Sequence, residues 1–150
     1  MPSSLELPLG TFAEQLVRHS NTEAQFSPDG KWIAFSGQKA ISGEDAEVYV
    51  GRFPGPGRRI HISNHGGAQP RWRADGKELF YITNDKKLMA VAMDMSHGEP
   101  AVGVPHILFQ TRIIATRTVV FQYVVSRDGN RFLINSMPSV GAAPLTVLMK

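Results

Sequence analysis

The chain has 150 residues, of which 42% are hydrophobic and 19% charged, and it contains no cysteine. This composition is typical of a folded globular protein and excludes a disordered chain, disulfide bonds, thiolate metal sites and cysteine nucleophiles. The formal net charge of +3 comes from scattered side chains, so we expect no nucleic-acid partner.

The N-terminal segment, residues 1–22, is expected to be separate from the repeats that follow it. It lacks a basic start followed by an apolar core, and the chain has no run of about 18 apolar residues, so neither a signal peptide nor membrane insertion is predicted. From this chain alone we expect a cytoplasmic protein, or a periplasmic or other extracytoplasmic one if it is a fragment of a longer protein. The segment has a short helical pattern at 11–17 and a candidate strand at 13–20.

From residue 23 onward, one pattern occurs three times. Asp-Gly pairs stand at 29–30, 75–76 and 128–129, which are 46 and then 53 residues apart. An apolar residue precedes each Asp by three positions, and an apolar run follows each Gly. Because Asp and Gly favour the backbone conformations of a tight hairpin, each pair predicts a turn between two antiparallel strands.

Each copy predicts up to four strands in the same order. The first strand ends three residues before the Asp, and the second strand follows the turn. The second strands are nearly continuous apolar runs, which indicates that both of their faces are buried. The expected second strands are 32–36, 78–83 and 131–136, the third strands 47–53, 87–93 and 145–149, and the fourth strands 58–63 and 106–110.

The length of the repeat is typical of the four-stranded blade of a β-propeller. We therefore expect an all-β fold, a β-propeller of four-stranded antiparallel blades, with about three blades at 23–66, 67–115 and 116–150. Three blades would make half of a six-bladed ring. A β-sandwich of short strands is the alternative fold, but it does not predict a sequence repeat of this period.

The stretches at 24–35, 47–57, 66–82 and 87–93 resemble the TolB-like, WD-repeat-like β-propeller, in particular the C-terminal blades of propellers attached to bacterial serine/threonine protein kinases. The stretches 125–136 and 143–150 are similar to the end of those proteins. The chain departs from that family at Ala74 and Arg127, where proline is usual, and at Asn130, where a basic residue is usual. No kinase signature is present. The resemblance implies a non-catalytic module for protein or peptide binding, with a sensor or scaffold role.

No catalytic motif accompanies the repeats. The nucleophile elbow G-x-S-x-G of serine hydrolases is absent, and we expect no enzymatic activity and no cofactor. The alternative function is the propeller portion of a hydrolase or carbohydrate-active enzyme whose catalytic part is absent from this chain.

No metal site is predicted either. His61 and His65 are four residues apart, but one lies in a predicted strand and the other in a loop. The acidic run at 43–47 lacks the spacing of a calcium loop, and we interpret it as a solvated loop. The aromatic residues near the inner strands are interpreted as core: Trp32, Phe35, Trp72, Phe80 and Tyr81.

The mouth of the propeller channel is the remaining candidate site. Loops that lead into the first strands, and the starts of those strands, ring this mouth, where partner peptides commonly dock. The polar residues at these positions are the ligand-binding candidates, and the alternative for each is that it only caps backbone groups or faces water. They are Gln25, His65, Gln69, Arg71, Gln122 and Tyr123.

The number of copies predicts a partner. Three blades cannot close a ring, because propellers generally have four to eight. The third copy has no fourth strand after 145–149, whereas 13–20 stands where the fourth strand of a preceding blade would be. We therefore expect a homodimer completing a six-bladed ring, in which each N-terminal segment completes the last blade of its partner. A truncated piece of a longer propeller is the alternative.

Overall fold

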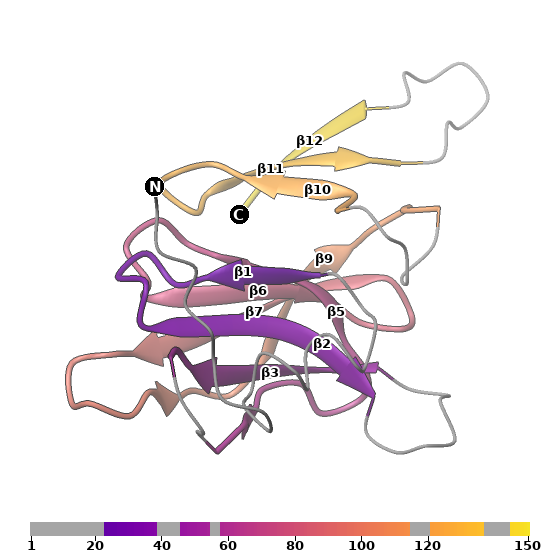
Figure 1. The fold of residues 1–150 in the computed structure, drawn as a ribbon. Helices are drawn as coiled ribbons and strands as arrows, with labels where there is room; N and C mark the ends of the chain where they lie inside the picture. Colours follow the sequence, from indigo (N-terminus) through magenta and orange to yellow (C-terminus); the bar gives the residue numbers. More distant parts are fainter. Residues whose placement is uncertain (1–22, 39–45, 55–57, 115–120, 137–144) are drawn as a thin grey trace, which may run out of the picture.

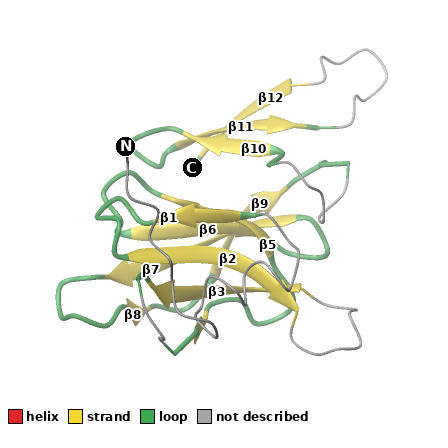
Figure 2. Ribbon diagram, in the orientation of Figure 1, coloured by secondary structure: helices red, strands yellow, loops and turns green. Residues whose placement is uncertain are grey.

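The computed structural model of the chain describes residues 23–38, 46–54, 58–114, 121–136 and 145–150. This part contains twelve β-strands and no helix (Figures 1 and 2). All the strand pairings within its three sheets are antiparallel. The prediction of an all-β, antiparallel chain is confirmed. The predictions for 1–22, the candidate helix at 11–17 and strand at 13–20 included, lie outside the described residues.

Each sheet is formed by consecutive strands, and each strand pairs with the next in sequence except β9, which pairs with β7. The first sheet contains β1 (Ala24–Phe26), β2 (Trp32–Gln38), β3 (Ala46–Arg52) and β4 (Ile60–His61). The second sheet contains β5 (Ala68–Trp72), β6 (Glu78–Ile82), β7 (Lys87–Asp94), β8 (Ala101–Val102) and β9 (His106–Gln110). The third sheet contains β10 (Tyr123–Val125), β11 (Arg131–Asn135) and β12 (Leu145–Met149). No helix of the described residues is long and apolar enough to cross a membrane.

The fourth strands differ from the sequence prediction. The strand expected at 58–63 is only two residues long, and beyond it Ser63 contacts β3 through its side chain, since its hydroxyl accepts the backbone N–H of Val48 at 2.8 Å. In the second sheet, β8 was not predicted, and it pairs with the end of β7 while β9 pairs with the start. The fourth position of this sheet is therefore occupied by two short strands in succession.

The Asp-Gly pairs form the predicted hairpins between first and second strands. Gly30, Gly76 and Gly129 have φ angles of 69°, 73° and 73°, the left-handed region that glycine enters without steric cost. In each turn the Asp carboxylate accepts the backbone N–H two residues later, at 3.1, 3.0 and 3.1 Å.

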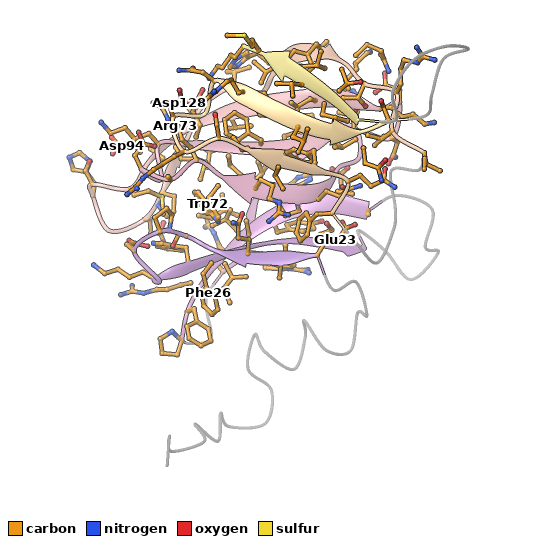
Figure 3. The ribbon with its side chains drawn as sticks, turned by 90° about the horizontal axis from the view of Figure 1, so that it is seen from above. Glu23, Phe26, Trp72, Arg73, Asp94 and Asp128 are labelled. Carbon is orange, nitrogen blue, oxygen red and sulfur yellow. The ribbon has the colours of Figure 1, made fainter. Side chains whose placement is uncertain are left out.

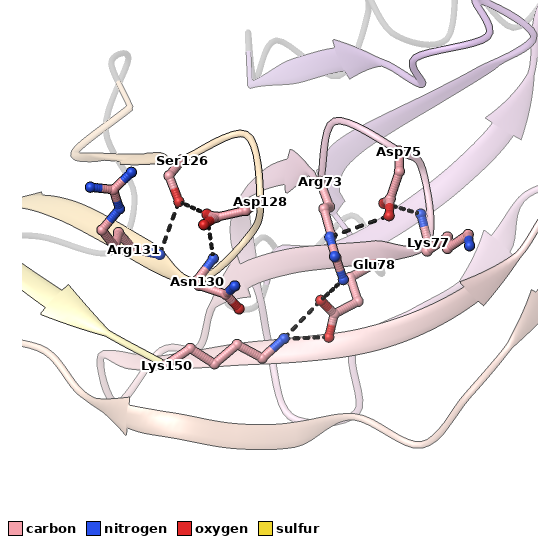
Figure 4. Close-up of polar contacts among 9 residues, drawn as sticks. All are labelled: Arg73, Asp75, Lys77, Glu78, Ser126, Asp128, Asn130, Arg131 and Lys150. Carbon is pink, nitrogen blue, oxygen red and sulfur yellow. Dashed lines mark hydrogen bonds and ion pairs between the residues drawn. The ribbon is translucent and has the colours of Figure 1, made fainter.

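Two of the hairpins are also closed by a serine. The hydroxyls of Ser27 and Ser126 accept backbone N–H groups five residues later, at 3.0 and 2.9 Å. In the second hairpin this position is Arg73, which instead pairs with Asp75 at 3.4 Å and Glu78 at 3.2 Å (Figure 4). The second and third turns, which have Ala74 and Arg127 where the first has Pro28, thus keep the left-handed glycine of the first turn.

The three sheets stack face to face in the order of the sequence (Figure 3). One core cluster lies between the first and second sheets and contains Trp32, Ala34, Val48, Val50, Ile62, Trp72, Leu79, Tyr81, Val91 and Met93. The other lies between the second and third sheets and contains Phe80, Ile82, Leu88, Ala90, Ile113, Tyr123, Phe132 and Ile134. The five aromatic residues predicted to lie in the core are all less than 9% exposed, which confirms that interpretation.

Two expectations about burial are wrong. The second strand of the third sheet, β11, is buried on one face only, since Phe132 is fully buried whereas Leu133 is 40% exposed. The sheet is covered by the second sheet on that one face. The acidic run at 43–47 is not wholly a solvated loop either, because Glu47 lies in β3 and is 3% exposed. Its carboxylate accepts hydrogen bonds from the Ser63 hydroxyl and from the Gly66 N–H.

Candidate binding site at the first strands

The first strands β1, β5 and β10 are edge strands of their sheets and are joined by hydrogen bonds between sheets. Between β1 and β5, the backbone N–H of Trp72 donates to Oε1 of Gln25 at 2.8 Å. The indole Nε1 of the same tryptophan donates to the Gln25 carbonyl oxygen at 3.2 Å. Gln25 therefore satisfies two donors of the second sheet.

A side-chain ladder continues this connection through all three sheets. Its members, Glu23, Gln69 and Gln122, each stand six residues before the Asp of a hairpin, and all three are less than 9% exposed. The N–H of Gln69 donates to Oε2 of Glu23 at 2.8 Å. The N–H of Gln122 donates in turn to Oε1 of Gln69 at 2.7 Å. The side chains of Glu23 and Gln69 thus each accept the backbone N–H at the same position of the following sheet.

Gln69, the middle member of the ladder, lies in a β-bulge. The register between β5 and β6 shifts between Ala68 and Arg71, and Gln69 has a φ of 56°. Left-handed backbone is costly for a residue with a Cβ and persists where surrounding interactions hold it. Here the backbone N–H, the side-chain Oε1 and the carbonyl oxygen of Gln69 all bond to neighbouring sheets.

Tyr123 is fixed by the same residue. Its hydroxyl donates to the Gln69 carbonyl oxygen at 2.7 Å, and the side chain is 2% exposed. Burial raises the pKa of Tyr123 well above its usual value, since the phenolate would lose its solvation. The hydroxyl therefore stays protonated and keeps its role as a donor.

Arg71 differs from its neighbours because part of its hydrogen-bonding capacity is unused. Its guanidinium carbon lies 3.7 Å from the ring centroid of Phe121, a cation–π contact. Its Nε is buried and has no hydrogen-bond partner in the described part of the chain. Desolvation lowers the pKa of Arg71. An arginine that keeps its charge and has an unpaired N–H is suited to binding an anion.

The structure brings most of the predicted site residues together at the sheet junctions. Gln69, Gln122 and Tyr123 contact one another directly, Gln25 contacts Trp72, and Arg71 lies on the same strand as Gln69. His65 is exposed in the turn between β4 and β5 and makes no hydrogen bond or ion pair with the other five within the described ranges. Gln25, Gln69 and Tyr123 thus have the backbone-capping role that the sequence offered as the alternative.

Sequence reasoning missed one member of the ladder, Glu23, and the signal was present. When the copies are aligned on their Asp-Gly pairs, the position six residues before the Asp is Glu, Gln and Gln. A buried acceptor side chain at a fixed repeat position predicts a repeated backbone contact.

The described residues show no cluster of side chains suited to binding a metal ion. They contain no group of three or more His, Asp or Glu side chains that could hold a metal ion. His61, one of the two histidines considered above, lies 3.3 Å from Glu47 and stacks on Tyr49 at 5.1 Å between ring centroids.

A scan against models of protein families finds no match for this chain, and a search of the curated proteins finds none either.

Proposed function

We propose that the chain is a non-catalytic module of TolB-like propeller blades that binds a protein or peptide, as a sensor or scaffold. The observation that carries the proposal is the side-chain ladder, which repeats one contact between successive antiparallel sheets of similar sequence. Such nearest-neighbour contacts are typical of repeat architectures, whose extended surfaces serve binding. The two copies of the homodimer expected from the sequence would supply six such units.

The first strands are the part of this module best suited to a ligand. Gln25, Gln69 and Tyr123 hold the strands together, and Arg71, which is only partly buried, supplies a guanidinium beside them. A guanidinium supported by an aromatic ring favours a carboxylate, so the ligand class is a peptide or protein segment with an acidic side chain or a free C-terminus. His65, exposed nearby in sequence, is the second candidate contact.

A displayed library of random peptides, selected on the immobilised chain, tests this function. We expect acidic peptides to be enriched, and their affinity in fluorescence anisotropy to fall at least tenfold in Arg71→Gln. Lys31→Gln removes an exposed positive charge from a hairpin and is the matched control, with no expected change. Equal binding by both variants would contradict the assignment of the site to Arg71.

The alternative, a propeller portion of a hydrolase or carbohydrate-active enzyme, is tested separately. Esters, peptides and glycosides incubated with the chain are expected to remain unhydrolysed. Turnover that disappears on substitution of one polar residue would contradict the non-catalytic proposal.

A further inference from the structure

Every sheet has a forward face, turned toward the following sheet, and a backward face, turned toward the preceding one. The second sheet shows both, because Leu79 and Tyr81 pack in the cluster shared with the first sheet, whereas Phe80 and Ile82 pack in the cluster shared with the third. Side chains alternate along a strand, so aligning the repeats assigns the faces of the two outer sheets. The forward face of the third sheet carries Leu133, and the backward face of the first sheet carries Ile33 and Phe35.

The forward face of the third sheet is apolar and exposed. Leu133 stands at the repeat position of Ala34 and Phe80, which are both completely buried, yet it is 40% exposed. Its cross-strand neighbours on this face, Val124 and Val147, are 49% and 61% exposed. Three adjacent apolar side chains on a sheet face that is covered in the other two sheets indicate a missing partner.

The ladder points to the same partner by an independent route. Glu23 and Gln69 each use a side-chain oxygen to accept a backbone N–H of the following sheet. The corresponding atom of the third member, Oε1 of Gln122, is buried and has no hydrogen-bond partner among the described residues. A buried acceptor without a donor is costly. A following sheet would supply that donor at the position where the second and third sheets already supply one.

The backward face of the first sheet has the matching character. Ile33, Phe35 and Tyr49 form a separate apolar cluster on it, with Phe53 packed alongside, and these three are only 4 to 8% exposed, so Phe26 is the apolar side chain that this face leaves open. Phe26 is 51% exposed on this side (Figure 3), whereas its counterpart Trp72 is 6% exposed against the preceding sheet. The first sheet therefore presents the kind of face that the second and third sheets already pack onto their predecessors.

The edges of the two faces are also chemically compatible. At the junction of the second and third sheets, Glu78 pairs with Lys150 at 2.6 Å. On the two outer faces, the repeat positions of these two residues are occupied by Arg131 and Phe53. An arginine over an aromatic ring is a favourable cation–π contact, and like charges do not meet.

We propose that the forward face of the third sheet docks onto the backward face of the first sheet of a second copy of this chain, with Gln122 Oε1 accepting a backbone N–H of the incoming sheet. This interface repeats the junction that the chain already forms twice within itself. The proposed interface rests on the proposed propeller function, and the protein partner at this interface is a second copy of the chain. Two copies place six sheets in sequence, and the same head-to-tail contact at both junctions closes the ring.

Light scattering coupled to size exclusion tests the interface at micromolar concentration. We expect the wild-type chain to have twice the monomer mass. Leu133→Glu on one face and Phe26→Glu on the other should each give a folded monomer, with the circular dichroism of the wild type. Val104→Glu, at a site 84% exposed outside both faces, is the matched control and should remain dimeric.

Mixing the two monomeric variants distinguishes head-to-tail docking from any symmetric contact. A mixed pair joins the intact forward face of the Phe26→Glu chain to the intact backward face of the Leu133→Glu chain, so dimers should reappear. A back-to-back contact of two third sheets would instead leave Phe26→Glu dimeric on its own. A folded wild-type monomer, or a mixture that stays monomeric, would overturn the proposal.

Gln122 has its own readout. Gln122→Leu removes the acceptor at both junctions of the ring and should weaken the dimer about a hundredfold, as expected for two buried hydrogen bonds of about tenfold each. Gln122→Glu keeps an acceptor, as Glu23 does in the first sheet, and should retain wild-type affinity. Equal affinity of the Leu variant and the wild type would contradict the ladder contact. Peptide binding at Arg71 is measured independently, so a dimer without peptide binding refutes the proposed function alone, and a monomer that binds peptide refutes the interface alone.

Discussion

Gln69 is the residue on which the contacts between the three sheets converge. Its side chain accepts the N–H of Gln122, its carbonyl accepts the Tyr123 hydroxyl, and its own N–H bonds to Glu23. The left-handed φ of 56° shows that these contacts are stronger than the local preference of the chain.

At position 69 we expect the glycine variant to be more stable than the alanine variant, the reverse of the usual order of stability. Gln69→Ala leaves the buried N–H of Gln122 without an acceptor, at a cost of about 1 to 3 kcal/mol. Gln69→Gly loses the same acceptor but relieves the left-handed strain of about 1 to 2 kcal/mol, so it should be the more stable variant in chemical denaturation. At Ala68, which does not have a positive φ, Ala68→Gly should be less stable than the wild type. If Gln69→Gly were less stable than Gln69→Ala, the proposed backbone strain at Gln69 would be contradicted.

The acid stability of the hairpins depends on hydrogen bonds to aspartate. The Ser126 hydroxyl, followed by the Asn130 N–H, holds the pKa of Asp128 below its usual value of 3.8, and Ser27 does the same for Asp29. A depressed folded-state pKa stabilises the fold above the unfolded pKa, and this contribution is lost as pH falls from about 4 through the folded pKa. Ser126→Ala should therefore raise the pKa of Asp128 in a carboxyl titration followed by NMR. An unchanged titration curve would contradict the hydrogen-bond origin of the shift.

Residue roles were only partly predictable from sequence. The role of the hairpin glycines could be predicted, because few residues other than glycine adopt the left-handed backbone conformation that the turn requires. The role of Gln69 was not, since a bulge and a contact to the next sheet depend on where two distant strands meet. The burial of Glu47 was not predictable for the same reason, since it depends on contacts between residues far apart in sequence. Its carboxylate bonds to Ser63 and Gly66, which lie 16 and 19 residues further along the chain.

At the scale of elements, the hairpin between β5 and β6 allows a direct test of turn conformation. Gly76 has a φ of 73°, and an added Cβ would meet nothing closer than Pro28 Cδ at 3.7 Å. The cost of Gly76→Val is therefore conformational, on the order of 1 to 3 kcal/mol. Ala74→Val, at an exposed position of the same turn, is the matched control and should change the denaturation midpoint little. Equal midpoints for the two variants would contradict the assigned conformation.

The positions of the second strands could be predicted from the repeat in the sequence, whereas the burial of the strands could not. Apolar runs and Asp-Gly turns located each second strand within a few residues, because both signals are local. Whether a strand is buried on both faces depends on its neighbours. The same kind of apolar run is covered twice in β6 and once in β11, where Leu133 remains exposed.

At the scale of the whole molecule, the second sheet is the only one of the three with both faces packed against described sheets. In a stacked array, the stability of each unit is its own plus that of the interfaces with its neighbours. The second sheet has two such interfaces within the chain, and each outer sheet has one. Local opening should therefore be most costly in the middle of the stack.

Hydrogen exchange followed by mass spectrometry should show this gradient and its dependence on the partner. In the monomeric Leu133→Glu variant, we expect the amides of β6 and β7 to exchange most slowly and those of β10 to β12 distinctly faster, because the third sheet opens without disturbing the first. In the proposed wild-type dimer, docking of a second copy would cover the forward face of the third sheet, so protection of β10 to β12 should rise toward that of β6 and β7. The exposed turn at 96–99, between β7 and β8, serves as the internal control, with equal exchange in both proteins. Uniform protection of all three sheets in the monomeric variant would contradict the additive view of the stack, because it would mean that the chain opens only as a single unit.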